Sequence, residues 1–392
     1  MLFVAVAVIF FLAGMEVDIF IPSYPELQQQ FGLSPAKVQL CLSLNFVTYC
    51  LGSLYAGALG DRYGLRKIIL YGLAVFVLGS IACCFAADFS HILAGRVLQG
   101  LGMAAPASLG YVIIAERYSA EQQASMLGTL NGCITVAMAF APVISSYVAI
   151  YAGWRGNFAV LLLLALIALG FCLFVLPKDD RKRESVSLSL STYLVLFQSN
   201  TFLKYLVIVC AYICSYWTFI GMGSILYIEG FGVSLANFGF YQGAIAGSFA
   251  VISFLSPKLL TVFGQAKCFK ISVILITIIS IFIGLAALCG VNNPVFITAL
   301  MCMFALPMVL PVNILYPLVL EVVPETKSRA AAVVNVARLV VSAVCIEIVS
   351  YFYNGKFLYL GLLIFGFSIV GLVFAKSVKF PAKIKSSFRR IS

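Results

Sequence analysis

Four polar side chains interrupt two apolar runs of the sequence. Glu16 and Asp18 end the apolar stretch at the N-terminus, and Arg96 and Gln99 lie within a later one. Charged groups are costly in a hydrocarbon environment, so such residues are functional candidates by default. A carboxylate enclosed there is neutralised either by a proton or by a cationic compound, and competition between the two would couple proton movement to solute movement.

The spacing of these residues limits what they can do together. Glu16 and Asp18 are two residues apart, which is about 200° of rotation on a helix, so both cannot point into one cavity. Arg96 and Gln99 are three apart and share a helix face. A buried guanidinium needs a carboxylate or polar partner, and Glu16 or Asp18 is the expected one.

Two alternatives place the same charges at the outer membrane surface. Asp18 could cap the outer end of its helix near Pro22 and face water. Arg96 could extend to the interface near Asp88 and His91. We interpret His91 as a structural residue at a turn rather than a proton relay.

Composition indicates the class of protein that positions these groups. Of the 392 residues, 63% are hydrophobic and 10% are charged, whereas soluble domains are about half apolar and a quarter charged. A membrane span needs about 20 apolar residues. The sequence therefore predicts an all-α membrane protein, and the apolar N-terminus is interpreted as a retained first span rather than a signal peptide.

Apolar runs separated by polar turns predict twelve spans. They cover residues 1–24, 38–59, 68–87, 91–114, 124–150, 158–176, 203–228, 240–256, 271–290, 295–320, 330–352 and 357–375. We expect a six-helix bundle over 1–176, a cytoplasmic linker over 177–202, a second six-helix bundle over 203–375, and a basic cytoplasmic tail over 376–392.

The positive charges predict the orientation. Twenty of the 25 Lys and Arg fall in the alternate loops and the tail that would be cytoplasmic, and three fall in the opposite loops. Short cytoplasmic loops concentrate positive charge, so both termini are expected inside. Because the cations sit in short loops and not on one face, the net charge of +11 does not indicate nucleic-acid binding. The twelve Cys lie mostly in apolar runs and indicate neither a metal cluster nor a disulfide framework.

The loop between the second and third spans carries the most specific pattern. It reads Gly57-Ala-Leu-Gly-Asp61-Arg62-Tyr-Gly64-Leu-Arg66-Lys67. The glycines allow the backbone to reverse. This pattern resembles the signature loop of the major facilitator superfamily, G-x-L-a-D-r-x-G-r-k. The resemblance implies two six-helix bundles, a central site at mid-membrane depth, and a role for this loop in the cytoplasmic gate, with Asp61 contacting the inner end of span 11 near Ser328 and Arg329.

Other segments resemble the drug:proton antiporters of that superfamily, in particular the bicyclomycin and chloramphenicol resistance branch. Asp18 with Pro22 matches the D-m-y-x-P segment, and the stretch around Arg96 and Gln99 matches R-x-x-q-G-x-g. The resemblance implies that Asp18 exchanges a proton for a drug in a central cavity and that Arg96 influences proton transfer.

Span 5 departs from the antiporter pattern. Pro142 is present, but the glycine that precedes it in the family's Gly-Pro motif is replaced by Ala141. The following Gly153-Trp154-Arg155 does match the branch. Because the Gly-Pro motif is the family's main sequence correlate of antiport, its loss weakens the expectation of export, and Pro142 is retained as a gate candidate.

The second half offers candidates for a substrate cavity. Tyr212, Tyr216 and Trp217 could line it with aromatic surface, although such residues are more often packing residues. Asn313 follows Pro311 in a span whose prolines would loosen the helix as a gate. Arg338 and Glu347 are charged within span 11 and nine residues apart, so they lie on opposite faces; they either bind an anionic group of the substrate or extend to the interfaces.

The sequence thus predicts a monomeric, proton-coupled exporter of small amphipathic compounds in a bacterial inner membrane. Its expected partners are the small-molecule substrate, protons and lipid, with no cofactor, no metal and no nucleic acid. One alternative is proton-driven uptake of a nutrient or metal chelate by the same fold. Another is a membrane-embedded enzyme or transport-inactive receptor, which the absence of a Ser/His/Asp constellation and of a phosphate-binding loop disfavours.

Overall fold

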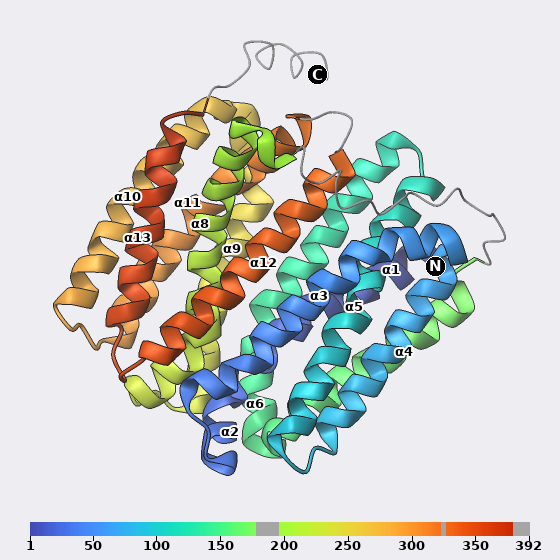
Figure 1. Cartoon of the computed structure of the whole chain (residues 1–392), viewed down its shortest axis with the longest axis horizontal. Helices are drawn as coiled ribbons and strands as arrows, with labels where there is room; N and C mark the ends of the chain where they lie inside the picture. The colour runs from blue at the N-terminus through green and yellow to red at the C-terminus, as the bar shows by residue number, and fades with distance from the viewer. Residues whose placement is uncertain (178–195, 323–326, 379–392) are drawn as a thin grey trace. The chain divides into compact units, whose positions relative to one another are not determined.

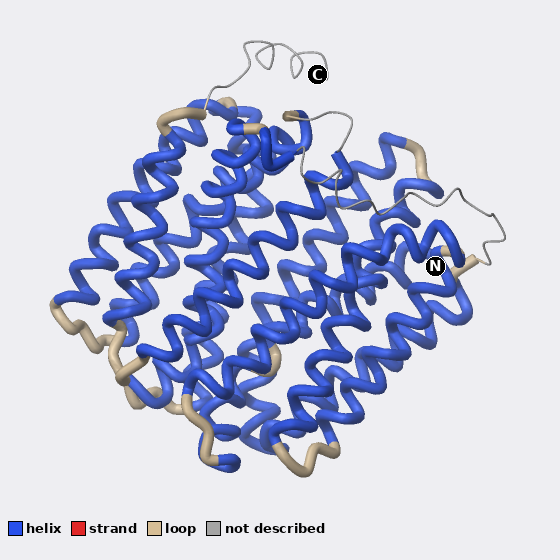
Figure 2. The backbone as a smooth tube through the Cα atoms, in the orientation of Figure 1, coloured by secondary structure: helices blue, strands red, loops and turns tan. Residues whose placement is uncertain are grey.

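The computed structural model describes residues 1–177, 196–322 and 327–378, and within these ranges every regular element is helical (Figure 2). Backbone polar groups in a bilayer have no water to bind, so spanning segments satisfy them within a helix. The first half holds α1 (Leu2–Asp18), the 3₁₀ turn η1 (Ile21–Ser23), α2 (Tyr24–Phe31), α3 (Pro35–Tyr63), α4 (Leu65–Cys84), α5 (Phe89–Arg117) and α6 (Ala120–Val175).

The second half has the same helical character. It holds α8 (Asn200–Ser224), the π-helical turn η2 (Ile225–Gly230), α9 (Leu235–Phe263), α10 (Gln265–Leu288), α11 (Pro294–Glu321), α12 (Lys327–Phe352) and α13 (Leu358–Ala375) (Figure 1). The predicted linker falls mostly on residues outside the described part, as does the predicted tail.

Helices long and apolar enough to cross a membrane number eleven in the described part of the chain. One of them, within α6, runs for 48 residues, Gly128–Val175, which is about twice the length of a span. Its helical path breaks at Gly153, where φ is +64° and ψ is −173°. The break coincides with the predicted turn between spans 5 and 6, so the twelve predicted spans are confirmed and the chain is a multi-pass membrane protein.

The chain forms two compact units. Unit 1 comprises Met1–Leu188, Ile220–Gly243 and Ala343–Gly355, and unit 2 comprises Ser189–Phe219, Ala244–Ser342 and Lys356–Ser392. The end of α8, the start of α9 and the end of α12 therefore pack within unit 1, although they belong to the second half of the sequence. The predicted division into bundles at 176 and 203 stays a prediction.

Small residues bring α4 and α5 together inside unit 1, where the two helices run side by side (Figure 1). A Cβ placed on Gly79 would lie 2.7 Å from the carbonyl oxygen of Gly95, and one on Gly102 would collide with the backbone of Phe76. Backbones approach this closely only where side chains are absent, which is the usual way membrane helices associate. This contact fixes α5, the helix that carries Arg96 and Gln99.

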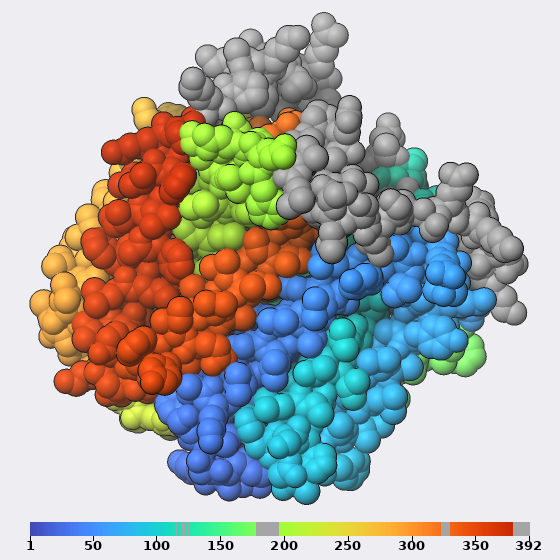
Figure 3. All heavy atoms as spheres, in the orientation of Figure 1, coloured from blue at the N-terminus to red at the C-terminus, as the bar shows by residue number. Residues whose placement is uncertain are grey.

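In unit 2, α10 packs against α11 and α13. The outward side of α10 is apolar, with exposed side chains that include Ile274, Ile278 and Phe282. The space-filling view shows α10 and α13 at the surface (Figure 3). Large apolar side chains on the outside of a long helix are expected where the surrounding solvent is lipid.

Candidate proton and substrate site

Glu16 and Asp18 are both buried at the end of α1, each with 2% of its surface exposed. The prediction that they point in different directions is confirmed by their neighbours. Asn45 on α3 donates from Nδ2 to Oε1 of Glu16 at 2.7 Å, whereas Asp18 lies beside Gln242 on α9. The two carboxylates therefore belong to two separate polar clusters within unit 1.

The cluster around Glu16 links three helices. Asn45 also donates to the backbone carbonyl of Arg96 at 3.2 Å, so one amide group contacts α1 and α5 from α3. Asn45 is 2% exposed. A buried amide that donates two hydrogen bonds holds its neighbours in register, and loss of either acceptor would leave a polar group unsatisfied.

Arg96 is completely buried, with 0% of its surface exposed. Its Nε donates to the carbonyl of Cys41 at 3.2 Å, and Nη1 donates to Oε1 of Gln99 at 2.8 Å. The guanidinium also lies 5.7 Å from the centre of the Phe20 ring, a cation–π contact. Gln99 in turn donates to Oγ of Ser80 at 2.9 Å, which confirms that Arg96 and Gln99 act from one helix face.

Two expectations about Arg96 are wrong. It does not extend to the surface near Asp88 and His91, because it is fully buried while those two residues pair with each other at 3.1 Å and are more than half exposed. It also forms no ion pair with Glu16 or Asp18 among the described residues, and its Nη2 has no hydrogen-bond partner there. Backbone and amide oxygens replace the expected carboxylate, and Glu16 supplies only a longer-range attraction.

Asp18 occupies the last position of α1. The alternative in which it faces water is wrong, since its side chain is enclosed. Its Oδ2 has no hydrogen-bond partner among the described residues. The carboxyl end of a helix carries partial negative charge, so a carboxylate there lacks the support that an amino-terminal position would give. The group is thus well placed to accept a proton.

Asp88 and His91 lie at the start of α5. Asp88 is the N-cap, and its carboxylate accepts from the backbone N–H of His91 at 3.0 Å. Such caps satisfy the free N–H groups of the first turn. His91 lies at the turn, as expected, and its structural role stays a prediction.

A second set of contacts joins α3 to the segments of α8 and α12 that lie in unit 1. Gln39 donates from Nε2 to the carbonyl of Gly221 at 2.8 Å. Ser43, one turn further along α3, donates to Oε1 of Glu347 at 2.6 Å. Glu347 is half-buried, so it has a specific partner rather than an interfacial position.

Contacts of the same kind continue toward the loops. Gln28 on α2 donates to Oε2 of Glu229 at 3.3 Å, and the hydroxyl of Tyr353 donates to the carbonyl of Ile225 at 3.3 Å. Burial, with Glu229 nearby, raises the pKa of Tyr353, so its hydroxyl remains a donor at neutral pH. All four residues of these two pairs belong to unit 1.

The sequence reasoning missed Gln39, Ser43, Asn45 and Gln242. The available signal was their spacing, because Gln39 and Ser43 are four residues apart on one face of an apolar helix. The sequence analysis singles out charged side chains, but an uncharged amide that is buried without a hydrogen-bond partner is also costly.

The family model described as Major Facilitator Superfamily matches residues 6–346. The chain belongs to the Major Facilitator Superfamily. It is 26% identical over 260 residues to a bicyclomycin resistance protein homolog of Haemophilus influenzae and 24% identical over 255 residues to the multidrug resistance protein MdtL of Shigella dysenteriae. The matches span 65% and 63% of the lengths of these relatives, and the same shares of this chain.

Solved structures of the superfamily have the same fold. A D-xylose–proton symporter aligns with a TM-score of 0.76 at 14% identity over 95% of both chains. The partially occluded, inward-open xylose transporter XylE of Escherichia coli aligns with a TM-score of 0.74 at 14% identity, over 96% of this chain and 95% of XylE. At this identity the likeness concerns the fold alone.

The superfamily signature is mostly helical in this chain rather than a loop. Helix α3 continues through Gly57, Asp61 and Arg62 to Tyr63, and the backbone reverses at Gly64, where φ is +93°. Gly57 is helical, so the turn forms at Gly64 and not, as expected, at several glycines. The predicted contact of Asp61 with Ser328 and Arg329 falls on side chains outside the described part.

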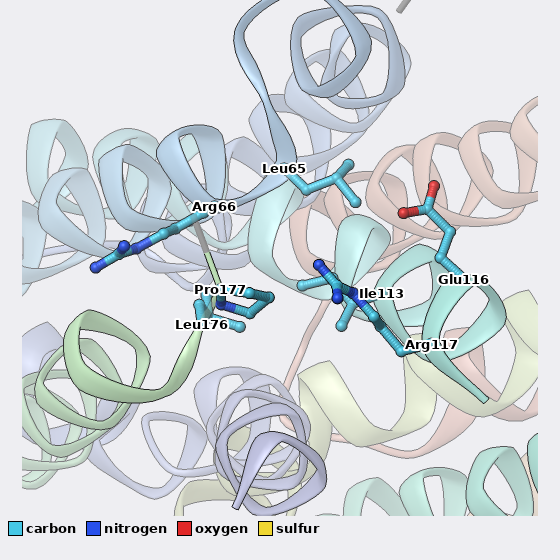
Figure 4. Close-up of a pocket in the computed structure, with 7 residues that line it drawn as sticks. All are labelled: Leu65, Arg66, Ile113, Glu116, Arg117, Leu176 and Pro177. Carbon is cyan, nitrogen blue, oxygen red and sulfur yellow. The ribbon is translucent and has the colours of Figure 1, made fainter. Parts of the chain in front are cut away.

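The cations of the signature have separate contacts. Arg62 lies 5.2 Å from the centre of the Tyr63 ring, Lys67 is exposed, and Arg66 donates from Nη2 to the carbonyl of Leu173 on α6 at 2.7 Å. Arg66 also borders a shallow pocket lined by Leu65, Arg66, Ile113, Glu116, Arg117, Leu176 and Pro177 (Figure 4). Ile113, which lines this pocket, lies about 25 Å along α5 from Arg96. The pocket is therefore separate from the cluster around Glu16 and Arg96.

Pro142 lies inside α6, where its carbonyl accepts from the hydroxyl of Ser145 at 3.1 Å. A Cβ on Gly239 of α9 would lie 2.7 Å from that same carbonyl. The absence of a side chain at Gly239 therefore permits α9 to approach α6 at the proline, three residues before Gln242 meets Asp18.

The predicted cavity aromatics differ in their surroundings within unit 2. Tyr212 is fully buried and packs so closely on Gly371 of α13 that a Cβ there would lie 2.6 Å from the ring, so it presents no free surface in this conformation. Tyr216 is 2% exposed, and the centre of its ring lies 5.3 Å from that of Phe249. Trp217 is half-buried.

Asn313 is exposed on α11 and donates from Nδ2 to the hydroxyl of Ser256 on α9 at 3.2 Å. Among the described residues, no group of three His, Cys, Asp or Glu is placed to hold a metal ion. The twelve Cys are all free thiols. The functional groups in the described spans include carboxylates, the guanidinium groups of Arg96 and Arg338, amides, thiols and aromatic rings.

Proposed function

We propose that this chain is a proton-coupled secondary transporter that exports small amphipathic compounds across a bacterial inner membrane by alternating access. The observation that carries the proposal is the burial of Asp18 with one carboxylate oxygen left without a partner among the described residues. The names of the relatives, a bicyclomycin resistance protein homolog and a multidrug resistance protein, support export.

Asp18 and Gln242 supply the coupling. When Asp18 is ionised, the Nε2 group of Gln242 can donate to it; when Asp18 is protonated, its hydroxyl can donate to Oε1 of Gln242. Both amide atoms of Gln242 lack another partner among the described residues, so the amide is free to serve either state. A cationic compound near Asp18 would compete with the proton, because either one neutralises the carboxylate.

Glu16, Arg96 and Gln99 set the electrostatic environment of this step. Arg96 is a fixed buried cation, and its attraction acts on Glu16, which Asn45 holds in place. We propose that Asp18 carries the transported proton and that the Glu16 cluster fixes α1 and α5.

The gates would work at opposite ends of the spans. The segments 220–243 and 343–355 pack in unit 1 through the Gln39–Gly221 and Ser43–Glu347 pairs, and we propose that these contacts break when the outer side opens. At the inner side, the signature residues of α3 and α4, with Gly64 as the turn, would form the cytoplasmic gate. Pro142, packed on Gly239, would allow α6 to bend during the change.

The charge distribution supports an orientation with both termini in the cytoplasm. We further propose that the chain works as a monomer in the lipid bilayer, with the proton as the coupling ion and with no organic cofactor or metal.

Accumulation of a fluorescent cation such as ethidium in energised cells tests this proposal. Cells with the wild-type chain should hold less ethidium than control cells, and a protonophore should abolish the difference. Asp18→Asn should behave like the empty control while remaining in the membrane, because an amide cannot exchange a proton. Ethidium exclusion that persists in the presence of protonophore would contradict proton coupling and would reopen the enzyme or receptor alternative.

Uptake remains a second candidate because of two features of this chain. The glycine of the antiport motif before Pro142 is replaced by Ala141, and Arg338 is a cation in a span. An importer would concentrate its solute inside right-side-out vesicles when an inward proton gradient is imposed. An exporter that exchanges its compound for protons would concentrate it only when the lumen is acidic, as in energised everted vesicles, so the direction of the proton gradient that drives accumulation decides between them.

A further inference from the structure

Arg338 is a cation at the middle of a membrane-spanning helix. It lies 11 residues after the start of α12 at Lys327 and 14 before its end at Phe352, which is about 16 Å and about 21 Å along the axis. An Arg side chain cannot cover such a distance to reach either interface. The expectation that Arg338 extends to an interface is therefore excluded by its position.

In the described part of the chain, the guanidinium of Arg338 forms no ion pair. Its Nε is buried without a hydrogen-bond partner, and none of its nitrogens makes an ion pair or a hydrogen bond with the described residues. In the described part of unit 2, Glu321 is the one carboxylate, and it is exposed at the end of α11. Glu347 on the same helix is nine residues away on the opposite face and already binds Ser43.

Helix α8 brings thiols near Arg338 and carries an aromatic side chain on the same face. The thiol of Cys214 on α8 donates to the Arg338 carbonyl at 3.4 Å, and Cys210 lies close to the guanidinium. Trp217 shares the helix face of these two cysteines, since the spacings are four and three residues. It is half-buried, as is Arg338, so both retain surface for a ligand.

A second polar pair lies one turn away on α12. Asn335 precedes Arg338 by three residues and therefore shares its face. Its Nδ2 donates to the hydroxyl of Tyr316 on α11 at 3.5 Å, and both side chains are half-buried. Amide and phenol donors beside a guanidinium are groups that bind a carboxylate or similar oxyanion, and the aromatic rings suit a flat apolar body.

We propose that Arg338, with Asn335 and Tyr316, binds an organic anion, so that the transported compounds include amphipathic molecules carrying a carboxylate or comparable oxyanion. The inference rests on the proposed function for its transport role, but the binding site itself does not.

Matched probes that differ in one group test the inference by binding alone. Equilibrium dialysis of the purified chain would compare 2-naphthoate with 2-naphthamide, which share a ring system and differ in charge. A charge-assisted hydrogen bond to Arg338 should make the acid bind about 10- to 100-fold more tightly than the amide. Arg338→Gln should bind both alike, and Arg338→Lys should keep part of the preference because it keeps the charge but not the planar fork.

Controls separate a local effect from misfolding. Lys356→Gln removes an exposed cation in the loop before α13 and should leave the preference unchanged. Size-exclusion profiles and the naphthamide affinity should be the same for wild type and Arg338→Gln. Failure of the wild type to prefer the acid, or a preference that survives in Arg338→Gln, would overturn the proposal.

Further measurements identify what binds at Arg338 and distinguish a failure of this inference from a failure of the transport proposal. If 100 mM chloride displaces naphthoate from wild type while naphthamide binding is unaffected, the site holds an inorganic anion and the proposal fails. Asp18→Asn should retain the naphthoate preference. If Asp18→Asn has normal export while Arg338→Gln loses acid binding, the coupling proposal fails and the anion site stands.

Discussion

Asn45 donates one hydrogen bond to the carboxylate of Glu16 at 2.7 Å and a second to the backbone carbonyl of Arg96 at 3.2 Å. One amide on α3 thus connects the acidic end of α1 to the basic centre of α5. In a span, each of these groups would be costly to leave unpaired. Asn45 therefore serves both the fold of unit 1 and the position of the two charges that the transport proposal uses.

Asn45→Leu should destabilise the chain more than an ordinary polar-to-apolar change. It leaves the Glu16 carboxylate without its short donor, at a cost of about 1–3 kcal/mol. Thermal unfolding in detergent measures the effect. Ser53→Ala is the matched control, because Ser53 on the same helix bonds only to its own helix, at the carbonyl of Cys50. Equal melting temperatures for the two variants would contradict a linking role for Asn45.

Arg96→Lys should lose most activity despite keeping the charge. Arg96 donates in two directions, to the carbonyl of Cys41 and to Gln99, and a single ammonium cannot reproduce the rigid fork. Loss of one charged hydrogen bond corresponds to about a 10-fold change or more in the rate of ethidium efflux. Arg62→Lys, at an exposed position on α3, should be much milder. Full activity in Arg96→Lys would show that only the charge matters.

Ser43→Ala should favour the outer-open state, because it removes the 2.6 Å bond to Glu347. Glu347→Gln keeps an oxygen acceptor and should have a smaller effect, while Glu347→Ala should match Ser43→Ala. Labelling of buried Cys41 by an impermeant maleimide from the outer side, in chains whose exposed Cys289 is replaced by Ser, reports opening. We expect about a 10-fold faster reaction in the two alanine variants, since a bond to a charged group is worth about 1.5–3 kcal/mol. Unchanged labelling in both would contradict the proposed outer gate.

Gly102→Ala and Gly57→Ala should differ sharply, although both glycines are helical. A Cβ on Gly102 meets the backbone of Phe76 on α4, whereas one on Gly57 meets nothing within 4 Å. Gly102→Ala should therefore separate α4 from α5 and lower stability by about 1–3 kcal/mol. Gly57→Ala should be neutral or stabilising by up to about 1 kcal/mol, because alanine is the better helix former. Detergent melting curves compare them, and a reversed order would contradict the packing of α4 on α5.

Much of the fold follows from the sequence, because in a bilayer the length of an apolar run and the position of polar breaks determine each span. The turn at Gly153 is an example, since Gly153-Trp154-Arg155 interrupts an otherwise continuous apolar stretch. The partners of the charged groups could not be predicted from the sequence. Periodicity gives the face of a helix but not the neighbour it meets, so Arg96 was expected beside a carboxylate and instead binds Cys41 and Gln99.

The contacts of Glu347 and Asp18 could not be predicted from the sequence either. Ser43 and Glu347 are 304 positions apart, and no local pattern relates them. Gln242 lies beside Asp18 because Gly239 permits α9 to approach α6 at Pro142. Such long-range pairs depend on how helices pack, and helix packing depends on small residues whose individual signal in a sequence is weak.

Proton release from energised everted vesicles tests the central claim most directly. Ethidium added to vesicles with the wild-type chain should cause release of accumulated protons, read as recovery of a pH-sensitive dye, and the same addition to Asp18→Asn vesicles should cause none. Matched amounts of both proteins in the membrane make the comparison valid. Proton release of equal size from the Asp18→Asn chain would contradict the account, because the proton would then be carried by a group other than Asp18.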